Sequence, residues 1–70
     1  MDKLVMTYRL GSEVIQLTWD KHSRGYYLSH YKHGRQLLYE FVGDDLSACC
    51  AYFQKFICDT VVLVNLGGPL

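Results

Sequence analysis

Apolar and polar residues alternate in four runs along the first part of the chain, near residues 3–10, 13–20, 25–32 and 35–42. The runs are rich in β-branched and aromatic side chains, and alternation of this kind is typical of half-buried strands. Turn signals separate them, at Gly11-Ser12, Lys21-His22-Ser23-Arg24-Gly25 and His33-Gly34. The pattern therefore predicts a four-stranded antiparallel meander.

The turns also predict a register, because directly paired residues of an antiparallel ladder point to the same face. Two tight loops with an even loop between them align three apolar rows across the sheet. We predict the core rows Tyr8-Ile15-His30-Leu37, Met6-Leu17-Leu28-Tyr39 and Leu4-Trp19-Tyr26-Phe41. The opposite face, called the open face below, is predicted to carry Arg9-Val14-Tyr31-Gln36, Thr7-Gln16-Ser29-Leu38 and Val5-Thr18-Tyr27-Glu40.

A helical period replaces the alternation after Gly43. Asp44 and Asp45 supply an N-cap and a first-turn anion, both of which stabilise the positive end of a helix. One apolar stripe follows, formed by Leu46, Cys49, Cys50, Phe53, Phe56 and Ile57. We expect this helix to cover the apolar sheet face, which makes residues 1–66 a single α+β domain and residues 67–70 a loose C-terminal tail.

Residues 61–66 form a strongly apolar, β-branched run. This composition is compatible with a short fifth strand, which would need a sheet edge or a second copy of the chain to cover it. The residues expected to make an oligomer contact are Val61, Val62, Leu63 and Val64.

The charge balance and the cysteines narrow the classes of function. The 70 residues carry equal numbers of acidic and basic side chains, so no whole-molecule field attracts nucleic acid or an anionic membrane. The three cysteines form a poor disulfide framework, and no apolar run approaches the length of a membrane span. We expect a cytoplasmic protein without membrane contact. A chain this short buries only about 60% of its unfolded surface, which favours a stabilising partner.

The open face is the surface on which binding is most plausible from the pattern. Its candidate residues are Arg9, Gln16, Tyr27 and Tyr31, with Lys32 and Arg35 at the strand ends. Our first hypothesis is a small non-enzymatic binding or regulatory protein that acts through protein–protein contacts and forms a homodimer. The alternative is a single-stranded nucleic-acid binder in which Tyr27 and Tyr31 stack on bases and the cations meet phosphates.

Other chemistry has little support in the sequence. The three histidines lie on different elements or faces, no paired Cys/His spacing occurs, and we expect no metal and no cofactor. Cys49 and Cys50 lie on the apolar stripe and are expected to be buried small residues rather than nucleophiles. No catalytic constellation can be assembled, so we expect no enzyme. A small-ligand pocket between helix and sheet near His30, Tyr8 and Trp19 is a third option.

Overall fold

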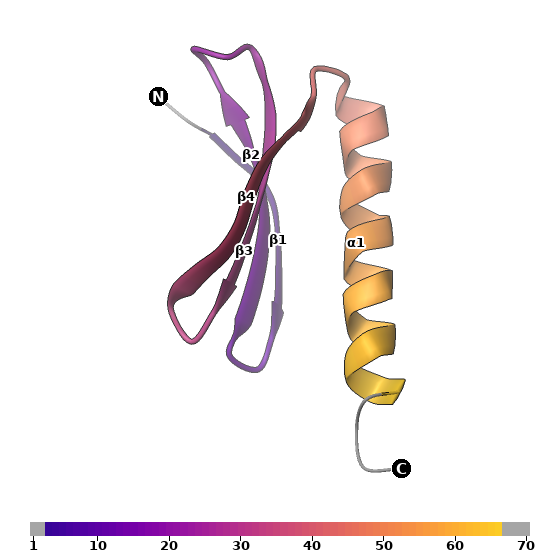
Figure 1. Ribbon diagram of the computed structural model, residues 1–70. Helices are drawn as coiled ribbons and strands as arrows, with labels where there is room; N and C mark the ends of the chain where they lie inside the picture. Colours follow the sequence, from indigo (N-terminus) through magenta and orange to yellow (C-terminus); the bar gives the residue numbers. More distant parts are fainter. Residues whose placement is uncertain (1–2, 67–70) are drawn as a thin grey trace.

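The computed structural model describes residues 3–66, and the side chains of residues 3–60. Four strands form one antiparallel sheet in the order β1-β2-β3-β4, and one helix packs on it (Figure 1). The elements are β1 (Lys3–Leu10), β2 (Glu13–Asp20), β3 (Gly25–Lys32), β4 (Arg35–Gly43) and α1 (Leu46–Leu66). The predicted α+β meander with one covering helix is confirmed. The predicted tail at 67–70 lies outside the described residues.

The turns have the geometry that their sequences predict. Gly11 has a φ of 60°, and the β1–β2 loop contains only Gly11 and Ser12, since Leu10 pairs with Glu13. His33 and Gly34 both have positive φ, at 54° and 76°, as the right-handed twist of a two-residue hairpin favours. The loop 21–24 has an even length, so the register continues from β2 into β3.

The predicted register is confirmed throughout the central pair of strands. Ile15 pairs with His30, Leu17 with Leu28, and Trp19 with Tyr26. The first hairpin also starts as predicted, with Tyr8 opposite Ile15 and Met6 opposite Leu17. An irregularity between Leu4 and Met6 then shifts β1, so Leu4 pairs with Thr18, and the predicted pairing of Leu4 with Trp19 is wrong.

The prediction for β4 is wrong over most of the strand. Tyr31 pairs with Gln36 as expected, but an irregularity between His30 and Tyr31 places Leu38 opposite His30. A β-bulge adds one residue to a strand, and since side chains alternate, every residue beyond it changes face. The predicted core residues Leu37, Tyr39 and Phe41 are therefore exposed, at 54%, 53% and 52%. Leu38, which was predicted on the open face, packs against the core instead, and so does Val42.

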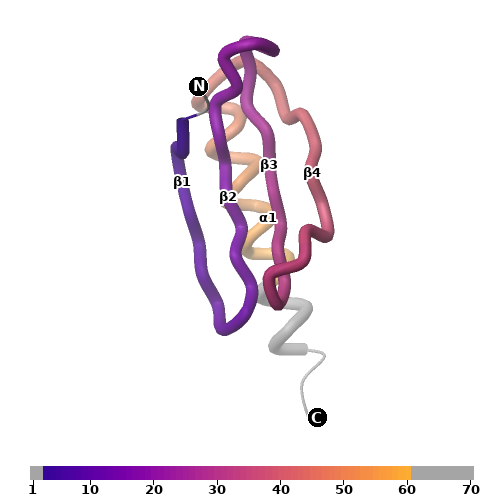
Figure 2. Tube along the Cα trace, turned by 90° about the vertical axis from the view of Figure 1, so that its left-hand side faces the viewer, coloured from indigo at the N-terminus to yellow at the C-terminus, as the bar shows by residue number. Residues whose placement is uncertain are grey.

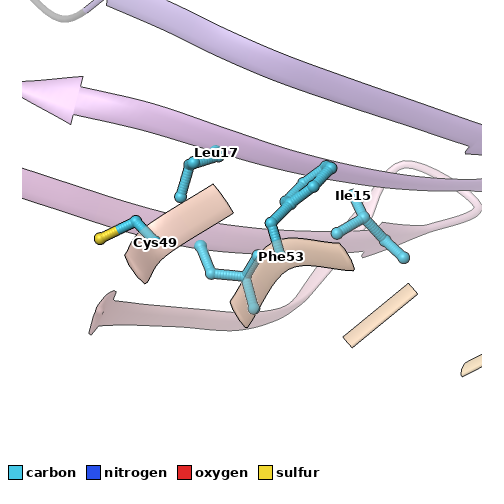
Figure 3. Packing of buried hydrophobic residues seen from close by; sticks show 5 residues of the cluster. Ile15, Leu17, Cys49 and Phe53 are labelled. Atoms are coloured by element: carbon cyan, nitrogen blue, oxygen red, sulfur yellow. The ribbon is translucent and has the colours of Figure 1, made fainter. Parts of the chain in front are cut away.

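α1 lies across β2, β3 and β4 and buries a small core between the two layers. Figure 2 shows the helix behind β2 and β3, with β1 to one side. The buried cluster joins Phe53 and Cys49 of α1 to Ile15, Leu17 and Leu28 of the sheet (Figure 3). The predicted apolar stripe of the helix is thus the face that packs, and Phe56 and Ile57 lie partly buried at its margin.

The first residues of α1 are as the sequence predicts, whereas its last residues are not. Asp45 is the N-cap, because its Oδ2 accepts a hydrogen bond of 2.8 Å from the Ala48 N–H. The helix continues to Leu66, so residues 61–66 are helical and the fifth strand is not formed. Once a helix has begun, each further residue adds a hydrogen bond, and the first breakers, Gly67 and Gly68, come after Leu66.

Candidate functional site

The open face of the sheet, on the side away from α1, consists of residues from all four strands. The register gives it three rows across the sheet, Leu4-Thr18-Tyr27-Phe41, Thr7-Gln16-Ser29-Tyr39 and Arg9-Val14-Tyr31-Gln36. Four predicted site residues, Arg9, Gln16, Tyr27 and Tyr31, therefore share this face. The row containing Arg9 has the predicted composition, whereas the other two gain aromatic residues from β4.

Three of these residues form what we call the aromatic cluster: Tyr27, Tyr39 and Phe41. The rings of Tyr27 and Tyr39 are stacked, with centroids 4.8 Å apart and planes 9° from parallel. Phe41 meets Tyr27 edge to face, with centroids 5.4 Å apart. The cluster is preformed, since its rings already hold one another in favourable aromatic geometry.

Polar contacts fix the two tyrosines that the sequence singled out. The Tyr27 hydroxyl lies 3.0 Å from Ser23 Oγ. The Ser23 hydroxyl in turn donates a hydrogen bond of 2.8 Å to Asp20 Oδ2. The Tyr31 hydroxyl accepts a hydrogen bond of 3.3 Å from Gln36 Nε2. Tyr27 is thereby held at its tip by the β2–β3 loop and along its ring by Tyr39.

Gly25 makes room for Phe41. A Cβ at Gly25 would lie 2.6 Å from Cζ of Phe41 and 2.8 Å from the carbonyl oxygen of Gly43. A side chain at this position would therefore displace the ring or the end of β4. Gly25 lies two residues before Tyr27, the register partner of Phe41, so it is a diagonal neighbour of Phe41 on the same face.

The charges of the open face lie at its two ends. Arg9 is at the end near the β1–β2 turn, and Asp20, which pairs with Gly25, is at the other, about 20 Å away along β2. Strand alternation places Lys32 and Arg35 on the side that α1 covers, opposite to Tyr31. The structure thus separates two of the three predicted phosphate-binding cations from the tyrosines.

Three titratable groups outside the open face, His30, Tyr52 and Cys49, make contacts between sheet and helix. His30 Nε2 lies 3.2 Å from Glu13 Oε1, and its ring meets Phe56 edge to face. Tyr52 of α1 donates a hydrogen bond of 2.6 Å to Glu40, which raises the pKa of the phenol above its ordinary value. Burial, reinforced by the nearby Asp45 carboxylate, raises the pKa of the Cys49 thiol. A thiol that stays protonated is a poor nucleophile.

The structure also bears on the ligand pocket, metal site and oligomer contact that were considered outside the open face. Trp19 lines a groove with Tyr26 at the start of α1, whereas His30 and Tyr8 are not among the residues that line it. In the part of the chain that the structure describes, no three His, Cys, Asp or Glu side chains are grouped to hold a metal ion. The described helix lacks the length of apolar sequence needed to cross a membrane. The side chains of Val61, Val62, Leu63 and Val64 lie outside the described residues.

Comparisons with protein-family models, curated proteins and solved structures find no match to this chain.

Proposed function

We propose that this chain is a small non-enzymatic binding protein that forms a homodimer through its open face. The observation that carries the proposal is the aromatic cluster, in which Tyr39 and Phe41 each expose more than half of their surface on a face that has few charges. Interface centres are rich in aromatic residues and poor in charged ones. A regulatory role through protein contacts would follow from such a surface.

A second copy of the chain is the occupant that the charges of the face favour. Consider a two-fold axis that lies in the interface between the two open faces and runs perpendicular to the strands. It would place Arg9 of one protomer against Asp20 of the other, since the two residues lie at opposite ends of the open face. A nucleic acid would meet one cation on this face, Arg9, and an acidic group at the far end. Electrostatics therefore support self-association more than phosphate binding.

The cysteines bear on where such a protein would act. Cys49, Cys50 and Cys58 are all free. Free thiols persist in reducing compartments, and this favours the cytoplasm as the site of action.

Sedimentation equilibrium of the wild-type chain and of Tyr39→Lys tests the proposal. We expect a dimer in the micromolar range for the wild type. Because a two-fold interface uses each residue twice, one substitution buries two lysines, and the dissociation constant should rise about tenfold or more. Gln54→Lys, at an exposed position of α1, is the matched control and should leave the equilibrium unchanged.

Two further results decide between occupants. Arg9→Glu should weaken the dimer if Arg9 faces Asp20 across the interface, and added salt should reduce that difference. A wild-type chain that remains monomeric at high micromolar concentration would contradict the proposal. Salt-sensitive binding of a single-stranded oligonucleotide, lost in a Tyr27→Ala, Tyr31→Ala double variant, would replace it with the nucleic-acid hypothesis.

A further inference from the structure

A second surface lies where α1 begins, at the β1 edge of the sheet, and it shares Leu4 with the open face. It is an open groove of about 480 Å³ lined by Lys3, Leu4, Val5, Trp19, Tyr26 and Leu46. Its volume is in the range of small-molecule sites in proteins. The aromatic cluster takes no part in it, so what binds here is a separate question from self-association.

The wall of the groove is aromatic and aliphatic. Trp19 and Tyr26 meet with ring centroids 4.9 Å apart and planes tilted by 59°, so their faces form an angled surface. Val5 of β1 is partly buried against the core, and Leu46, the first residue of α1, also lines the groove and is 48% exposed. Such a lining favours a flat or flexible apolar group, which would displace water from both aromatic rings.

One charge lies among the lining residues, that of Lys3. Asp45 is adjacent to Leu46 in the chain, but its carboxylate accepts the Ala48 N–H and lines a different hollow, together with Asp44. The apolar residues and the single ammonium group of the lining together match a molecule with an apolar body and one anionic end.

We propose that this groove binds a small amphiphilic carboxylate, with its apolar body against Trp19 and Tyr26 and its carboxylate at Lys3. Apolar contact supplies most of the affinity, since an exposed ion pair contributes little. Lys3 supplies the preference for an anion over an uncharged or cationic analogue.

Trp19 makes the test direct, because it is the chain's one tryptophan and it forms part of the groove wall. The full chain is titrated with octanoate, octanol and octylamine below their micellar concentrations, and the Trp19 fluorescence is recorded. We expect a saturable change with all three probes, tightest for octanoate and weakest for octylamine. A linear response, or equal affinity for the three, would overturn the proposal.

Two substitutions assign the charge preference to the groove. Lys3→Gln should weaken octanoate binding about two- to fivefold and leave octanol binding unchanged. Leu46→Glu, which suits the first turn of a helix, should weaken octanoate and strengthen octylamine. Lys55→Gln, at an exposed position farther along α1, is the control and should change neither. If Lys3→Gln and Lys55→Gln behave alike, the carboxylate does not lie at Lys3 and the proposal fails.

Discussion

At the scale of single residues, Gly25 and Phe41 depend on each other, because the Phe41 ring lies where a side chain at position 25 would be. Position 25 can accept a methyl group without a clash with the ring only if Phe41 is replaced by a smaller residue. The dependence is also long-range in sequence, since it joins the first residue of β3 to the end of β4.

We expect Gly25→Ala to lower the free energy of unfolding by about 1–3 kcal/mol, because the new Cβ overlaps Phe41 and approaches the Gly43 carbonyl. In a Phe41→Ala background the same substitution should cost clearly less, since the ring is gone. Urea unfolding of the wild type, both single variants and the double variant measures the coupling. Additive effects would show that the ring does not cover Gly25.

The Tyr52–Glu40 hydrogen bond is a second residue-scale dependence, and it joins α1 to β4. The pKa of Tyr52 is raised in the folded chain, so the contribution of this bond to stability is present below the unfolded phenol pKa of about 10. That contribution is lost as the pH rises through the folded pKa, because the phenolate can no longer donate to the carboxylate.

Tyr52→Phe should therefore lower the midpoint of urea unfolding at neutral pH, and the gap to the wild type should close above about pH 10. Comparing the two chains at each pH cancels the titration of the other tyrosines. Tyr31→Phe is the control, since the Tyr31 hydroxyl accepts its hydrogen bond from Gln36 and does not bond to a carboxylate. A gap that stays constant with pH would contradict the assignment.

At the scale of elements, β4 decides which side chains each face receives. Its bulge directs Leu38 toward the helix and leaves Leu37 exposed. Leu37→Lys should change the free energy of unfolding by no more than about 0.5 kcal/mol, as at most surface positions. Leu38→Lys should cost about 2 kcal/mol or more, because it brings a charge to the margin of the core. Circular dichroism during urea unfolding distinguishes the pair, and the reverse order would indicate a regular β4.

The same strand shows what sequence reasoning can and cannot supply. Turn residues with special backbone requirements, such as Gly11 and Gly34, determine the lengths of the β1–β2 and β3–β4 loops, so the meander could be predicted. The β2–β3 register follows from the even length of loop 21–24. Within β4, the alternating set Leu37, Tyr39 and Phe41 is as a whole more apolar than the set Leu38 and Glu40. Hydrophobicity alone therefore assigns the wrong set to the core. No glycine or proline marks the bulge in this part of the strand.

The error extended to the candidate site. Tyr27 and Tyr31 were predicted on the open face from strand alternation and turn lengths, and the structure places them there because β3 keeps the predicted register with β2. Tyr39 and Phe41 were missed because their position depends on the bulge. The β-branched composition of residues 61–66 was compatible with a short fifth strand, but continuation of an established helix overrides that preference.

At the scale of the whole molecule, the two proposed surfaces share only Leu4, which belongs to one row of the open face and also lines the groove. The aromatic cluster is on the open face, and the groove lies where α1 begins. A dimer centred on the aromatic cluster would leave the groove residues other than Leu4 outside the interface. Binding of a carboxylate and self-association should then be independent, apart from effects on stability.

Self-association also predicts a stability that depends on protein concentration, because a dimer unfolds to two chains. Raising the concentration tenfold should raise the wild-type Tm by a few degrees. Tyr39→Lys should show a smaller dependence, and Gln54→Lys should behave like the wild type. Differential scanning calorimetry over a concentration series makes the comparison. A wild-type Tm that does not change with concentration would contradict the dimer.

The two outer strands of the sheet also differ in how well they could accept another strand. β1 is regular from Met6 to Leu10, whereas β4 is interrupted at two places. A fibre built by strand addition needs each molecule to pair with one neighbour through one outer strand and with another neighbour through the other outer strand. Because bulges bend β4 and break its row of free peptide groups, growth through the edges stops once the β1 edges are occupied. The irregularity that moved Tyr39 and Phe41 outward thus also guards against amyloid-like polymerisation.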